Sequence, residues 1–84
     1  MTSKRNSIPL DRLNSGQSVR IHYLPEGDFR ARFIRLGIHE GEQVRCLERL
    51  PGGTVVLQKN RQQIAIGHQL ARQILVVAAD DAAR

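Results

Sequence analysis

The sequence predicts a small, mainly β domain in which about five short strands close into a barrel, with one short α-helix after the first strand. Residues 18–23 and much of 43–66 alternate apolar with polar side chains, as half-buried strands do. Only residues 28–36 space their apolar side chains along one helix face. One short helix cannot cover an open sheet. The economical arrangement is therefore a sheet closed into a barrel, which limits the exposed strand edges.

With 84 residues the chain has room for one domain, expected over residues 8–78. Residues 1–7 carry two positive charges and no apolar anchor, and we expect them to form a disordered N-terminal tail. The polar residues 79–84 are expected to form a C-terminal tail. At the start of the domain, Leu10 and Leu13 share one side of a helical turn that Pro9 can begin.

The first strand is predicted over residues 18–23. Val19, Ile21 and Tyr23 alternate there with polar residues, so all three are expected to point into the core. The segment LPEG follows, with proline and glycine in turn positions.

The helix is predicted to begin at Asp28, whose carboxylate can cap the first turn. Gly37 is placed to end it, because glycine reaches the left-handed backbone without a Cβ clash. Ile38 would then pack on Phe33 in a Schellman ending. The helix is amphipathic: the inward face is made by Phe29, Phe33 and Leu36, and the arginines outside it are Arg30, Arg32 and Arg35.

Three strands are predicted in the segments EQVRCLERL, TVVLQK and RQQIAI, joined by LPGG and by a turn at Asn60, where asparagine tolerates a positive φ. GHQLAR supplies a helical turn with Leu70 inward, and ILVV supplies a closing strand. The whole order predicts an SH3-like barrel. The apolar face of the three strands consists of Val44, Cys46, Val55, Leu57, Ile64 and Ile66.

The formal charge of +5 and the pI near 10.7 suit an acidic partner, but a solvated basic surface explains them equally well. No apolar run approaches the roughly 18 residues of a membrane span, and the polar opening lacks the apolar core of a secretory signal. The single cysteine, Cys46, agrees with a reducing compartment. We therefore expect a cytoplasmic protein with no direct membrane insertion.

The sequence predicts no catalytic residue, no set of metal ligands and no cofactor. Cys46 occupies a core position of a strand, where a free cysteine behaves as a small hydrophobe. The three histidines lack the spacing of zinc sites. No phosphate-binding GxxxxGK[ST] or GxGxxG motif and no GxSxG elbow is present, which indicates a protein that is not an enzyme.

Nucleic-acid binding is an alternative function, because small basic barrels bind RNA or single strands. The helix arginines Arg30, Arg32 and Arg35 could contact phosphates. The stacking platforms of such proteins are missing, since all three aromatic residues fall on expected core faces.

Three segments in order, LDRLNSGQSVRI, RFIRLGIHEGEQVRCLERLPGGTVVL and IAIGHQLARQILV, resemble the FeoA family of small cytoplasmic accessory proteins of bacterial ferrous-iron transport. The resemblance runs from about Ile8 to Val77, and the helix stop RLGIHEG is its most specific part. The chain departs from the family pattern at Glu40, where proline is usual, at Asn60, where glycine is common, and at Phe33, where leucine is expected.

The resemblance implies an SH3-like barrel that docks on the cytoplasmic side of a ferrous-iron transporter, whose G-protein domain hydrolyses GTP, and modulates uptake. The barrel also resembles the C-terminal domain of iron- or manganese-dependent repressors. In this chain no helix-turn-helix precedes the barrel and no cluster of metal ligands accompanies it.

The predicted partner-binding residues lie in and just before the basic helix. Arg30, Arg32 and Arg35 would meet carboxylates on the transporter, with Leu24 and Pro25 offering an apolar contact beside them. A merely solvated face is the competing interpretation of the arginines. The sequence leaves open whether the protein binds metal, whether it stimulates or inhibits transport or GTP hydrolysis, and whether it associates weakly with itself.

Overall fold

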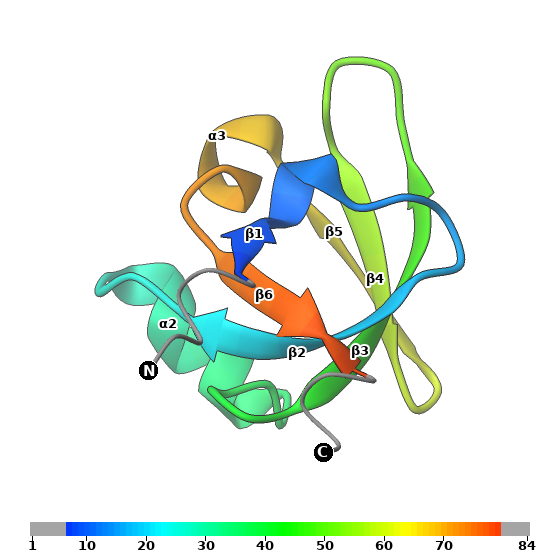
Figure 1. The fold of residues 1–84 in the computed structure, drawn as a ribbon. Coiled ribbons are helices and arrows are strands. Elements are labelled where there is room, and N and C mark those ends of the chain that lie inside the picture. Colours follow the sequence, from blue (N-terminus) through cyan, green and yellow to red (C-terminus); the bar gives the residue numbers. More distant parts are fainter. Residues whose placement is uncertain (1–6, 80–84) are drawn as a thin grey trace.

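The computed structural model describes residues 7–79 of the chain, and most of the two expected tails, residues 1–6 and 80–84, lies outside the described residues. The described part contains one six-stranded antiparallel sheet in the order β1-β6-β2-β3-β4-β5 (Figure 1). Its elements are β1 (Ile8–Pro9), the 3₁₀ turn η1 (Leu10–Arg12), β2 (Ser18–Tyr23), α2 (Asp28–Arg35), β3 (Gln43–Arg49), β4 (Val55–Lys59), β5 (Gln62–Ile66), α3 (His68–Ala71) and β6 (Leu75–Ala78).

The prediction of a mainly β, SH3-like fold with one short helix is confirmed, but the helix, expected after the first of about five strands, follows the second of six. One short strand was missed. Pro9 was expected to begin a helical turn, but Ile8 and Pro9 pair with β6 as β1, and the turn starts only at Leu10. Proline is acceptable there because β1 is an edge strand.

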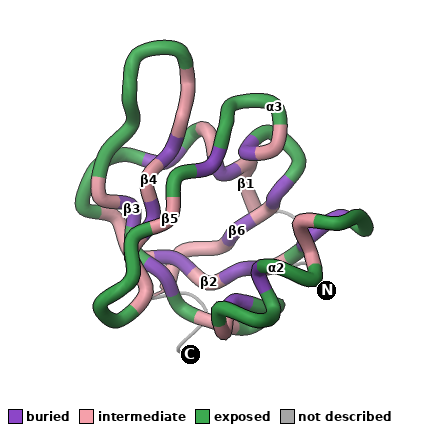
Figure 2. The backbone as a smooth tube through the Cα atoms, turned by 180° about the vertical axis from the view of Figure 1, so that it is seen from behind, coloured by how far each residue is buried: buried purple, intermediate pink, exposed green. Residues whose placement is uncertain are grey.

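The core lies inside the curve of the sheet and is made of alternate residues of β2, β3, β4 and β6 together with side chains from the connecting segments (Figure 2). The predicted apolar face of β3, β4 and β5 is confirmed, with Ile64 only partly buried. Cys46 is completely buried, and this burial raises the pKa of its thiol. The fully buried thiol behaves as a small core hydrophobe.

Tyr23 does not point into the core as expected, since it is 46% exposed. The register of β2 against β6 shifts between Ile21 and Tyr23, so that two residues of β2 advance against one of β6. An extra residue of this kind reverses the side-chain alternation beyond it. The bulge therefore turns Tyr23 outward at the end of β2.

Helix α2 begins at Asp28, one residue earlier than a cap at Asp28 requires. Gly27 is the N-cap, and no side chain caps the helix. Asp28 instead lies in the first turn, where its negative charge interacts favourably with the positive end of the helix dipole. The prediction of a side-chain cap was wrong.

The end of α2 is a Schellman motif, as predicted. The N–H of Ile38 donates to the carbonyl of Phe33 at 2.8 Å, and the N–H of Gly37 donates to that of Ile34 at 2.9 Å. Gly37 has φ of 86°, in the left-handed region. Phe33 and Ile38 are both buried, which fixes the direction in which the chain leaves the helix.

Within the described residues, no helix is both long enough and apolar enough to cross a membrane.

Candidate functional site

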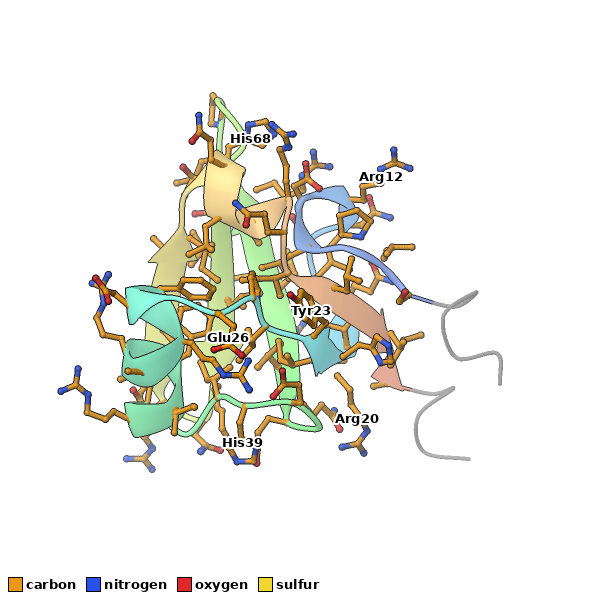
Figure 3. The ribbon with its side chains drawn as sticks, turned by 90° about the vertical axis from the view of Figure 1, so that its left-hand side faces the viewer. Arg12, Arg20, Tyr23, Glu26, His39 and His68 are labelled. Atoms are coloured by element: carbon orange, nitrogen blue, oxygen red, sulfur yellow. The ribbon has the colours of Figure 1, made fainter. Side chains whose placement is uncertain are left out.

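The predicted docking residues lie on α2 and on the loop that leads into it, but the structure gives them different roles. Figure 3 shows Glu26 in the loop before α2 and His39 in the loop after it. These two loops lie close together, because one arginine and one glutamate join them.

Arg30 and Glu40 form a two-point ion pair, with Nη1 3.0 Å from Oε2 and Nη2 3.0 Å from Oε1. The same Nη1 donates to the carbonyl of Leu24 at 2.6 Å, and the N–H of Leu24 donates to Glu40 Oε2 at 3.1 Å. The Arg30–Glu40 clamp therefore holds the start of the helix, the loop before it and the loop after it.

The clamp also shifts the pKa values of its two charged side chains. Hydrogen bonds from Arg30 lower the pKa of Glu40, and the hydrogen bond from the Leu24 N–H lowers it further, against the opposing effect of desolvation. The same contact raises the pKa of Arg30. Both groups are thus charged at neutral pH, and Arg30 is engaged within the protein rather than available as a free partner contact.

Leu24 and Pro25 were predicted to offer an apolar contact to a partner, and this prediction was wrong. Leu24 is 1% exposed and belongs to the core cluster, and Pro25 is also buried. The clamp holds the N–H and the carbonyl of Leu24, while its side chain packs in the core.

Arg32 and Arg35 are exposed, and neither side chain forms a hydrogen bond or ion pair with another residue of the described range 7–79. Of the predicted arginines, these two remain open to a partner.

A groove lies beside Arg32, between α2, β5 and α3, and the sequence did not predict it. We call it the α2–β5 groove; it encloses about 290 Å³. Leu36, expected on the buried face of the helix, is 37% exposed at the C-cap and lines the groove instead. The lining residues are Phe29, Arg32, Phe33, Leu36, Ile64, Ala65, Ile66, Gly67 and Leu70.

Other ion pairs among the described residues lie on the surface. Glu42 accepts from Lys59 Nζ at 2.9 Å and lies 3.1 Å from His39 Nε2, and the Lys59 hydrogen bond lowers the pKa of Glu42. His68 Nε2 is 3.4 Å from a carboxylate oxygen of Asp11, at another end of the molecule (Figure 3). No three histidine, cysteine or acidic residues of the described chain gather as a metal site would require.

The chain is similar to solved structures of one kind. An iron uptake regulatory protein, FeoA, is 24% identical with a TM-score of 0.72, over 84% of this chain and 96% of that one. The FeoA protein from Chlorobium tepidum is 22% identical with a TM-score of 0.77, over 86% and 70% of the two chains. The FeoA-like protein from Clostridium acetobutylicum is 21% identical with a TM-score of 0.71, over 88% of each chain.

At these identities the structural likeness establishes the fold. No curated protein matches this chain. The model of the FeoA domain family, however, matches residues 8–78. The chain therefore belongs to the FeoA family, whose members are non-enzymatic accessory proteins of ferrous-iron uptake.

Proposed function

We propose that this protein is a cytoplasmic accessory module that docks on the cytoplasmic side of a ferrous-iron transporter with a GTPase domain and modulates uptake. Its family membership supports the pathway, and the domain expected over residues 8–78 is the docking unit. The observation that carries the docking surface is the pair of exposed, unpaired arginines on α2, Arg32 and Arg35.

The rigid base beneath these arginines supports a docking role. The Schellman ending fixes one end of α2 and the Arg30–Glu40 clamp fixes the other. A surface held in one conformation loses little entropy on binding. Two charges on such a surface mainly set the rate of association and the orientation of the partner.

Nucleic-acid binding is the competing function. In the described residues Tyr23 is a well-exposed aromatic residue, which supplies one stacking platform instead of the several that single-strand binders use. The same titration that tests docking separates the two functions.

The test is an NMR titration of the ¹⁵N-labelled protein with the purified cytoplasmic GTPase domain of a ferrous-iron transporter. We expect saturable shifts on α2, and weaker binding as salt is added. The variant R32E/R35E should bind at least about tenfold more weakly. A mixed single-stranded oligonucleotide is titrated in parallel.

The matched control is R12E/R49E, which changes the net charge by the same amount at exposed arginines outside α2. Equal weakening by both double variants would show a response to net charge alone. Absence of binding to the transporter domain, with saturable shifts from the oligonucleotide, would replace the proposal by nucleic-acid binding.

A further inference from the structure

We propose that the α2–β5 groove receives an extended, acidic segment of the partner, which adds to the free edge of β5 as a further strand. This inference rests on the proposed function for the identity of the partner. It goes further in naming the binding site and the chemistry of the segment that enters it.

The lining of the groove shows that it follows the edge of β5. Consecutive residues of a strand point to opposite faces of the sheet. Ile64, Ala65 and Ile66 nevertheless all line the groove, and so does Gly67. A cavity that touches four residues in a row must run alongside the backbone.

The backbone groups on this side of β5 have no strand to pair with. β5 is the last strand of the described sheet and pairs only with β4. The pair next to the two-residue turn, Lys59 and Gln62, is a hydrogen-bonded pair, and such pairs alternate along an antiparallel ladder. The N–H and carbonyl of Ala65 therefore point to the free edge, within the groove.

The two edges of the sheet differ in protection. Natural edge strands are kept from pairing by proline, by charged residues or by being very short. The edge at β1 has two residues, one of which is Pro9. β5 has the sequence QQIAI, with five residues, no proline and no charge. An unprotected edge beside an apolar groove is the arrangement that strand addition uses.

The groove also specifies what the added strand carries. Its volume of about 290 Å³ is at the low end for ligand pockets and suits one or two apolar side chains. Arg32 is the single charged residue among the described side chains that line it. Arg32 has no acidic partner within the described residues. A carboxylate on the added strand, next to its apolar side chains, would therefore pair with Arg32.

The test uses the full chain, ¹⁵N-labelled, and a blocked peptide of about seven alternating Leu and Asp residues, the length of a common strand. We expect saturable shifts in β5 and α2 and slower amide exchange at Ala65. A peptide with Lys in place of Asp should bind at least about tenfold more weakly. A peptide with N-methylated backbone amides along one edge should give no saturable shifts, since it cannot form the ladder.

Two variants localise the site. R32E should weaken binding of the Asp peptide at least about tenfold, whereas R35E, with the same charge change on the same helix outside the groove, should change it less than about threefold. A65P removes the N–H of Ala65, which points away from β4. The hydrogen bonds between β4 and β5 are kept, and an edge strand tolerates a proline at such a position. It should abolish the slowed exchange along β5. If A65P does not fold, L36Q tests the apolar floor of the groove, because Leu36 is half-exposed.

The outcomes separate this inference from the proposed function. If the transporter domain binds the wild-type protein and the variants R32E, A65P and L36Q equally, docking stands and the groove is not its site. If the peptide binds in the groove and the transporter domain does not bind at all, the groove stands and the proposed partner is wrong. Concentration-dependent shifts in β5 without peptide would assign the edge to a second copy of the chain and overturn the proposal.

Discussion

Glu40 connects two loops that are far apart in sequence. It receives two hydrogen bonds from Arg30 and one from the Leu24 N–H, and it stands where the FeoA pattern usually has proline. A proline there would stiffen the turn by fixing φ. In this chain an ion pair fixes the same turn from outside.

Glu40 makes the stability of the protein depend on pH. The pKa of Glu40 is lower in the folded protein than its ordinary value of 4.5, chiefly through the hydrogen bonds from Arg30. Its stabilising contribution is therefore complete above that ordinary value and is lost as the pH falls through the folded pKa. We expect E40Q to be less stable than the wild type at pH 7, with the difference shrinking on acidification below about pH 4.5.

Urea unfolding of both proteins across this pH range measures the difference. Because the carboxylate is more than a third exposed, solvent screening keeps the effect small. A difference that stays constant from neutral to acid pH would mean that the charge of Glu40 has no part in the clamp.

At the scale of the element, α2 depends on how it ends. Gly37 has φ of 86°, and a Cβ built there would meet only Lys59 Cε at 3.5 Å, an ordinary contact. The cost of a side chain at this position is therefore conformational rather than steric crowding.

We expect G37A to lower the free energy of unfolding by about 1 kcal/mol, which is the cost of a left-handed backbone for an L-residue. G37N should lose less, because asparagine visits this region more readily. Chemical denaturation of the three proteins tests the order. Equal stability of G37A and the wild type would show that the helix can end in another way.

The whole molecule is an antiparallel sheet with two unequal edges, and amide exchange should reflect this. The four inner strands, β6, β2, β3 and β4, each pair on both sides. We expect their amides to be the slowest to exchange and the outward amides of β5, at Gln63 and Ala65, to exchange fast. Exchange followed by NMR measures this. Strong protection of Ala65 in the free protein would mean that the edge of β5 is already covered.

Local patterns in the sequence predicted most of the fold. The alternation over residues 18–23 and 43–66 identified the main strands, and the LGI segment identified the Schellman ending down to the contact of Phe33 with Ile38. These features depend on side-chain period and on the conformational freedom of glycine, which act within a few residues. For the same reason the sequence placed Cys46 in the core.

The candidate site was predicted only in part. Arg32 and Arg35 are exposed as expected, because their positions on an amphipathic helix follow from its period. Arg30 also lies on this helix outside its apolar face. Its partner Glu40 is ten residues away, however, and no local pattern reveals that pair. Leu24 and Pro25 were misplaced because their burial depends on contacts with segments more distant in the chain, as the hydrogen bonds of Leu24 with Glu40 and Arg30 illustrate.

The sequence by itself determined the mainly β class, the positions of the turns and the family, since each follows from residues that are close together in the chain. The tertiary structure alone decided which edge of the sheet is unprotected, that Tyr23 turns outward at a bulge, and that Leu36 lines a groove with β5. Those features arise where segments distant in sequence meet. Strand register and the shape of the α2–β5 groove depend on the packing of all these segments together.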